Sequence, residues 1–109
     1  MKIELGTVEK TVINQFKGGE GSISAVMFVD ELNRIMLGEL PPGASIGMHL
    51  HDQSSEIIFC ISGEGVVVCD GVTERLAEGD CHYCKKGSSH TLKNESDKLL
   101  RFYAVVPQQ

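Results

Sequence analysis

Short apolar runs alternate with turn-forming residues along most of the chain. Each run is four to eight residues long and rich in β-branched or aromatic residues, which is typical of strands. The runs cover residues 11–16, 22–29, 35–40, 57–61, 66–69 and 99–106. Glycine, proline and aspartate clusters separate them, and Asp70-Gly71 has the sequence of a type I′ hairpin turn. The pattern predicts an all-β sandwich or barrel.

One segment, residues 28–36, has a different period. Its apolar residues recur at spacings of three and four, as on a helix, and they are Val29, Leu32, Ile35 and Met36. Asp30 has a suitable side chain and position to cap a helix. The segment therefore predicts a single helical turn within an otherwise all-β chain.

Length and charge narrow the classes of function. A chain of 109 residues fits one domain with its own core. The formal net charge is −5 and no lysine and arginine cluster could follow a phosphate backbone, so we expect no nucleic acid partner. The sequence has no signal-like segment and no apolar run of about 18 residues. We therefore expect a cytoplasmic protein without a membrane partner.

We expect the four cysteines to be packing residues rather than redox or metal-binding ones. They are Cys60, Cys69, Cys81 and Cys84, and the missing signal segment favours reduced thiols over disulfides. Cys81 and Cys84 form a CxxC pattern, but residues three apart on a strand point to opposite faces. We expect two small packing residues there, not a redox or zinc unit.

Two histidines, His49 and His51, carry the first chemical signal. If residues 45–51 form a strand, their side chains alternate between two faces. One face holds Ile46, Met48 and Leu50, and the other holds Ser45, Gly47, His49 and His51. Both imidazoles then point the same way, as a chelate requires, and Gly47 leaves the space beside them clear.

Glu56 begins the next apolar run, which we expect to be buried on both faces. A buried carboxylate without a partner is costly, and coordination to a metal would remove that cost. The alternative places Glu56 at the mouth of a solvated loop, with His49 and His51 as surface residues. Spacing alone leaves both interpretations open.

A fourth ligand has two candidates, His82 and His90. If Lys93 faces solvent, His90 shares the inner face of its strand with Leu92 and Asn94, so His90 is favoured. If Lys85 faces outward, His82 and Cys84 face inward. For His82 we expect a core histidine with satisfied hydrogen bonds, and the alternative is a residue behind a ligand or facing substrate.

Two spaced motifs resemble those of the cupin superfamily. The first is Gly, five residues, His-x-His, three or four residues, Glu, six residues, Gly, and it is met by Gly43, His49, His51, Glu56 and Gly63. The second is Gly, five residues, Pro-x-Gly, two residues, His, three residues, Asn, and it is met by Gly79, Gly87, His90 and Asn94. Lys85 stands where the family usually has proline, so the turn loses a residue of fixed φ.

The resemblance implies a single-domain jelly-roll β-barrel, commonly a homodimer. It implies a conserved barrel over residues 38–107 and N-terminal strands within residues 1–37 that complete the barrel and the dimer interface. It also implies that His49, His51, Glu56 and His90 hold one divalent transition metal, which could be Mn, Fe, Ni, Cu, Co or Zn. A pocket beside the metal is expected to be lined by Ile58, Cys60, Leu92 and Met36, with His82 nearby.

Three functional hypotheses follow from this resemblance. The leading one is a metal-dependent enzyme acting on a small organic molecule by oxygenase, decarboxylase, isomerase or lyase chemistry. The second is a non-catalytic module that binds a metal and a small ligand, as a sensor or accessory protein. The third is a barrel that retains the motif and functions without metal.

Overall fold

The computed structural model describes residues 1–6 and 9–109 and contains almost only strands. The strands are β1 Thr11–Asn14, β2 Ser22–Val29, β3 Asn33–Leu40, β4 Ser45–Leu50, β5 Glu56–Ser62, β6 Glu64–Cys69, β7 Val72–Ala77, β8 Cys81–Cys84, β9 Ser89–Lys93 and β10 Leu100–Pro107. A short 3₁₀ helix, η1 Phe16–Gly18, follows β1. The predicted all-β class is therefore confirmed. Residues 7 and 8, within the predicted N-terminal segment 1–37, lie outside the described residues.

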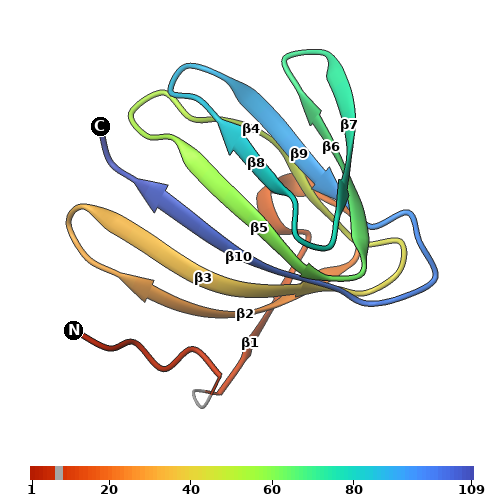
Figure 1. The fold of residues 1–109 in the computed structure, drawn as a ribbon, viewed down its shortest axis with the longest axis horizontal. Coiled ribbons are helices and arrows are strands. Elements are labelled where there is room, and N and C mark those ends of the chain that lie inside the picture. The colour runs from red at the N-terminus through yellow and green to blue at the C-terminus, as the bar shows by residue number, and fades with distance from the viewer. Residues whose placement is uncertain (7–8) are drawn as a thin grey trace.

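The strands form two antiparallel sheets that face each other (Figure 1). One sheet has six strands in the order β1-β2-β3-β10-β5-β8, and the other has four in the order β4-β9-β6-β7. The core between them is apolar and includes the fully buried Leu40, Ile58, Leu92 and Phe102. This is the jelly-roll barrel that the motifs predict. Among the described residues, no helix is long and apolar enough to cross a membrane.

A β-hairpin replaces the helical turn predicted within residues 28–36, so that prediction was wrong. β2 and β3 pair directly, and Val29 lies opposite Arg34. Asp30 does cap a turn, because its Oδ1 accepts hydrogen bonds from the backbone N–H groups of Leu32 and Asn33 at 2.9 and 2.7 Å. The helical spacing arises because a tight turn joins two strands, each with its own alternation.

The other turn prediction is confirmed. Asp70 and Gly71 have φ values of 48° and 81°, and Cys69 pairs with Val72 across them. Both central residues of a type I′ turn require positive φ, which explains why aspartate and glycine occupy them. Strand β6 therefore ends at Cys69, and the turn of the β6–β7 hairpin begins with the next residue.

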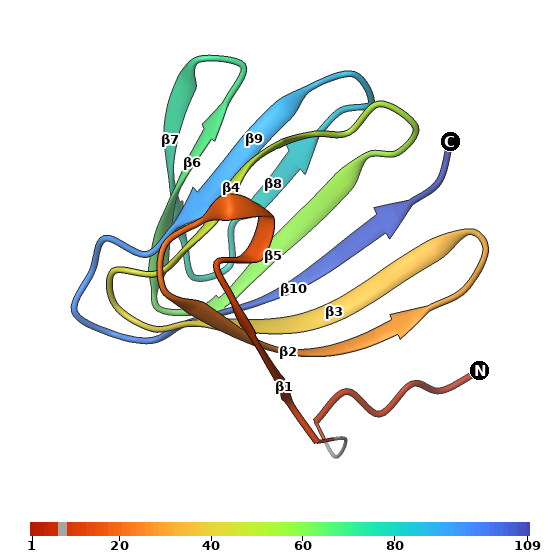
Figure 2. The same cartoon turned by 180° about the vertical axis from the view of Figure 1, so that it is seen from behind.

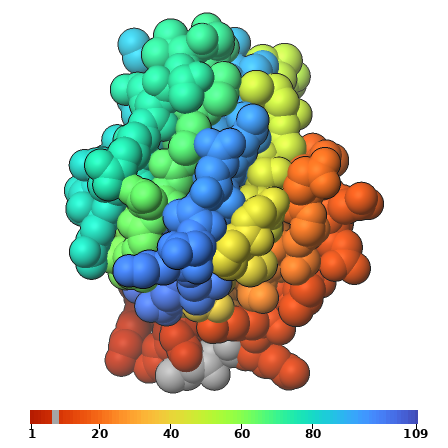
Figure 3. Space-filling view, turned by 90° about the vertical axis from the view of Figure 1, so that its right-hand side faces the viewer, coloured from red at the N-terminus to blue at the C-terminus, as the bar shows by residue number. Residues whose placement is uncertain are grey.

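The N-terminal segment packs against both sheets. β1 and β2 extend the larger sheet beyond β3, and β3 itself crosses the predicted boundary between residues 37 and 38. Between β1 and β2, η1 packs against β4 of the smaller sheet. The views from behind and from the side show this segment beside β4 (Figures 2 and 3). A Cβ on Gly47 would collide with the backbone carbonyl of Lys17. Because Gly47 has no side chain, η1 can pack directly against β4 at this point. The prediction that Gly47 leaves open space beside the histidines was therefore wrong.

Candidate metal centre

A β-bulge in β4 decides which side chains face the barrel interior. The pairing of β4 with β9 shifts between Ile46 and His49. Ile46 is buried, whereas Met48 and Leu50 are 54% and 57% exposed, so the predicted shared face of these three residues was wrong. A bulge changes the face that later residues occupy. His49, opposite His90 on β9, therefore faces inward along with Ile46.

Glu56 is the first residue of β5 and is only 3% exposed. Ile58 and Cys60 follow it on the same buried face. The opposite face is more open, because Phe59 is 47% exposed, so the predicted burial of this strand on both faces was wrong. The buried placement of Glu56 is as expected, and the alternative of a solvated carboxylate does not hold.

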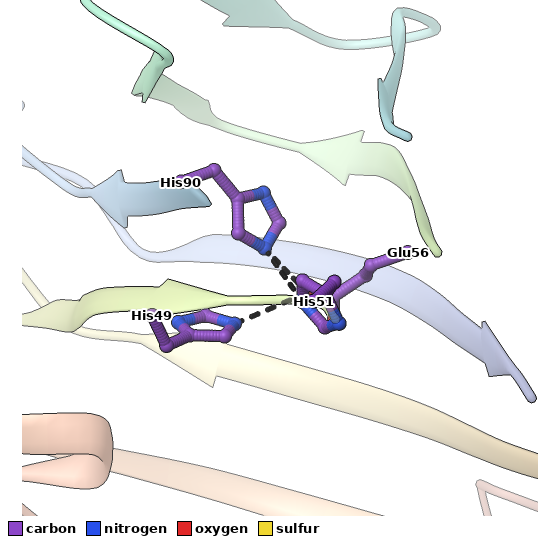
Figure 4. Close-up of side chains that lie close together, drawn as sticks. All are labelled: His49, His51, Glu56 and His90. Atoms are coloured by element: carbon purple, nitrogen blue, oxygen red, sulfur yellow. Dashed lines mark hydrogen bonds and ion pairs between the residues drawn. The ribbon is translucent and has the colours of Figure 1, made fainter. Parts of the chain in front are cut away.

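The four predicted ligands converge on one point near the ends of three strands (Figure 4). The Nε2 atoms of His90, His51 and His49 lie 2.7, 3.1 and 3.6 Å from Glu56 Oε1. The Nε2 atoms of His51 and His90 are 3.1 Å apart. Ligands about 2.1 Å from one ion and at right angles to each other are about 3 Å apart, so these separations suit a single metal ion.

Each histidine has a partner for its other ring nitrogen. His49 Nδ1 lies 2.7 Å from the Gly47 carbonyl oxygen, His51 Nδ1 lies 2.9 Å from Ser54 Oγ, and His90 Nδ1 lies 2.9 Å from His82 Nε2. A carbonyl oxygen only accepts, so Nδ1 of His49 donates to it, and Nε2 is the ring atom left to face the other candidate ligands. Outer partners of this kind orient metal-binding imidazoles, and the residues present therefore fit a transition-metal centre.

Electrostatics keep Glu56 ionised. Burial by itself raises the pKa of this carboxyl group, but the contacts with His49, His51 and His90 outweigh burial and hold the pKa well below its usual value. The other carboxylate oxygen, Oε2, lies 3.9 Å from Arg34 Nη2. Glu56 thus directs one oxygen to the histidines and the other toward a cation on β3.

The loop before His90 is fastened to the His-x-His segment. His51 donates its backbone N–H to Ser88 and accepts from the N–H of Gly87, at 3.0 and 2.6 Å. Gly87 has a φ of 90°, and the N–H of Ser88 donates to the Lys85 carbonyl at 3.0 Å. The turn therefore closes with lysine at the position where proline is usual.

The predicted neighbours of the site lie in two places. Ile58, Cys60, Leu92 and Met36 belong to the hydrophobic core, and their predicted role in lining a pocket stays a prediction. His82 faces inward on β8, as expected, and contacts His90. Burial lowers the pKa of His82, and the charge of His90 lowers it further. His82 is therefore the outer partner of a candidate ligand.

Two residues near the candidate metal centre, Arg34 and Phe16, were not predicted from the sequence. Arg34 on β3 is 22% exposed at its side chain and lies over the Phe16 ring, with its Cζ 6.0 Å from the ring centroid. Both residues come from the first third of the chain, outside the two spaced motifs. Pairing of β3 with β10 and of β10 with β5 brings Arg34 to Glu56, and Phe16 contacts Arg34 from η1, so neither residue carries a sequence signal of its placement.

The fold and the cluster define a small jelly-roll barrel with a candidate transition-metal centre. The model of the cupin domain family matches residues 36–106 of this chain, and the chain belongs to that family. An oxalate-binding protein of Thermotoga maritima is 31% identical over 100 residues, which is 86% of this chain and 83% of that protein.

Solved structures agree on the fold. A Thermotoga maritima protein described as a predicted oxalate decarboxylase superposes with a TM-score of 0.93 and 27% identity, covering 100% of both chains. A cupin-superfamily sugar phosphate isomerase from Silicibacter pomeroyi gives a TM-score of 0.80 at 21% identity, covering 100% of this chain and 76% of that one. The second likeness bears on the fold alone.

Proposed function

We propose that this protein is a metal-dependent cupin that binds a small carboxylate, with oxalate as the first candidate. In this proposal one divalent transition metal is held by His49, His51, Glu56 and His90. The supporting observation is the convergence of three imidazoles and one carboxylate beside Arg34. The similarity to a protein named for oxalate binding supports the choice of ligand.

Charge supports a dianionic ligand. A divalent ion and the Glu56 carboxylate, with three neutral imidazoles, leave one net positive charge, and Arg34 adds a second. Oxalate carries two negative charges near neutral pH, so it would balance the site. A guanidinium also forms paired hydrogen bonds with a carboxylate, which lysine cannot reproduce. We infer that Arg34 holds the ligand carboxylate that extends toward β3.

The protein's own residues have distinct tasks in this proposal. His49 is the most exposed of the four candidate ligands, with 14% of its side chain accessible, so the ligand enters on its side. Phe16 supports the Arg34 guanidinium from η1 and excludes water on one side. A bound divalent ion would supply Lewis acidity that polarises a carboxylate.

Binding without turnover is the form of this activity that we propose first. Among the contacts described for the four clustered side chains, Glu56 is the single carboxylate, and it is assigned to the metal. These contacts therefore offer no second carboxylate as a general acid or base. The second candidate is decarboxylation, favoured by the similarity to a protein described as a predicted oxalate decarboxylase. Oxygenase, isomerase and lyase chemistry have no comparable support.

Calorimetric titration of oxalate into protein loaded with manganese tests the proposal. We expect saturable binding that needs the metal, and an Arg34→Ala loss of about tenfold to a hundredfold in affinity with metal content unchanged. Arg75→Ala is the matched control, because Arg75 pairs with Glu64 on the surface. Metal-loaded protein that binds no oxalate would contradict the proposal. Formate in the mixture would favour decarboxylation.

The homodimer and the cytoplasmic location stay predictions. The outer face of the six-stranded sheet supports a dimer, because Phe59 and Tyr103 pair across β5 and β10 and are 47% and 44% exposed. Adjacent exposed aromatic residues favour contact with another protein surface. A second copy of this chain is the occupant that we propose. Sedimentation of wild type and Phe59→Asp would test it, with dissociation of the variant expected.

A further inference from the structure

A second group of metal-binding side chains lies behind His90. It consists of Cys69 at the end of β6 and of His82 and Cys84 on β8, and their candidate ligand atoms all lie within 4.8 Å of one another. Cys84 is fully buried, His82 is 8% exposed, and Cys69 is half-buried. We call these three residues the thiol cluster. Its members come from both sheets.

Strand pairing explains how the thiol cluster forms. Cys69 lies opposite His90 on β9, and Cys84 lies opposite Glu56 on β5. Each thiol is therefore the cross-strand neighbour of a candidate ligand of the first centre. Cys81, the other half of the CxxC pattern, is exposed on the opposite face of β8. The expected separation of the CxxC residues is confirmed, but Cys84 has partners elsewhere.

The donor set of the thiol cluster differs from that of the first centre. Two sulfurs and one imidazole nitrogen form a soft set, which selects thiophilic ions with closed d shells. We propose that Cys69, His82 and Cys84 form a second metal site for such an ion, zinc(II) or copper(I). On binding, the two thiols lose their protons to solvent and the sulfurs coordinate as thiolates.

The surface beside the thiol cluster favours entry of a cation. Burial raises the pKa of Cys84 to about 12, and the neighbouring Cys69 adds to the effect, so the incoming ion must displace the proton of the Cys84 thiol. A surface depression of about 420 Å³ reaches Cys69 and His82. Asp70 and Glu74 also line it, against one cation, Lys85, so its carboxylates favour entry of a cation.

The hydrogen bond between His82 and His90 couples the two sites. If His82 binds the second ion through Nδ1, its Nε2 carries the proton and donates to His90 Nδ1. Neutral His90 would then be protonated at Nε2, the atom that faces Glu56. If His82 instead binds through Nε2, His90 loses its outer partner. In both cases an ion in the thiol cluster weakens the first centre.

Cobalt(II) titration of reduced, metal-free protein tests the second site separately from the first. Only a thiolate ligand gives cobalt an intense near-ultraviolet charge-transfer band. We expect this band in wild type, in Cys81→Ser as the matched control, and in His49→Ala, which impairs only the first centre. Cys69→Ser and Cys84→Ser each keep one thiolate, so each should lose at least half of the band, and the double variant should lose all of it. No band in wild type, or an undiminished band in Cys69→Ser, would overturn the proposal.

A measurement on wild type avoids any variant that fails to fold. We expect zinc(II) or copper(I) to protect Cys69 from iodoacetamide, as read by peptide mass spectrometry, while Cys81 reacts at the same rate with and without metal. Parallel titrations against a zinc chelator and a copper(I) chelator identify which ion is retained. Equal labelling of Cys69 with and without both ions would overturn the second site and leave the carboxylate proposal intact.

Discussion

The first centre and the thiol cluster lie at the same end of the barrel but are organised differently. The connections β4–β5, β6–β7 and β8–β9 all lie at this end, at the top of Figure 1. In the first centre every imidazole has an outer partner that fixes its orientation. In the thiol cluster, Cys84 has weaker sulfur contacts, one from its Sγ to the Ser88 carbonyl at 3.7 Å and one with Cys69. The imidazoles, including His82, are therefore oriented in advance by their partners, whereas the two thiols are held by weaker contacts.

This difference shows that strand pairing determines where the two groups of ligands lie, whereas the type of donor atom determines which metal each group prefers. Pairing of β4 and β6 with β9, and of β5 with β8, places both groups, whatever their chemistry. The side chains at those positions then set the preference, which is borderline for imidazole and carboxylate and soft for sulfur. His82 belongs to both arrangements, as the partner of His90 and as a member of the thiol cluster.

The largest effect is expected from His90→Ala, because it removes a ligand and the link between the groups. Metal affinity of the first centre should fall by more than the roughly 10–100-fold typical of losing an outer partner. Elemental analysis after dialysis measures the loss. Lys93→Ala, on the same strand, is the control and should retain metal. Full metal content in folded His90→Ala would show that His90 is not a ligand.

His82→Leu should have the next largest effect. It removes the hydrogen-bond partner of His90 Nδ1 and should weaken metal binding at the first centre about 10–100-fold. His82→Gln offers an acceptor at a similar place and should restore part of the affinity. A chelator competition measures both. If Gln and Leu were equally weak, the contact with His90 would not be what matters, and the two groups would be independent.

The sequence predicted the features that depend on neighbouring residues along the chain, but not those that depend on how strands pair. Alternating runs and turn residues predicted an all-β sandwich or barrel, and the resemblance to the cupin motifs predicted that His49, His51, Glu56 and His90 come together, because those signals lie along the chain. The β4 bulge could not be predicted, since it depends on pairing with β9. Arg34 and Cys69 reach their positions only through sheet pairing, so neither shows a local pattern.

Acid should act on the first centre in two steps. Imidazoles coordinate only when neutral, so we expect metal release as the pH falls below about 6. In the metal-free protein, the pKa of Glu56 is held well below its usual 4.5. Ionised Glu56 therefore stabilises the fold at any pH above about 4.5, and that contribution is lost as the pH falls through the lowered pKa.

Urea denaturation of metal-free protein between pH 7 and 3 measures the second step. Wild type should lose more stability on acidification than Glu56→Gln, which has no carboxyl group to titrate. Glu31→Gln is the control for loss of a surface carboxyl group, because Glu31 is exposed in the turn between β2 and β3. Parallel curves for wild type and Glu56→Gln would contradict the lowered pKa.

The smallest effect concerns the turn that joins the two groups, between Cys84 and His90. Lys85→Pro restores the residue that is usual there and reduces the freedom of the unfolded chain, which should stabilise the protein by about 0.4–1 kcal/mol. Cys84 before it is in a strand, a conformation compatible with a following proline. Thermal unfolding, with Lys85→Ala as the control, measures the gain. Destabilisation by proline alone would mean that this turn needs the lysine backbone, and that the sequence departs from the motif because its local conformation differs.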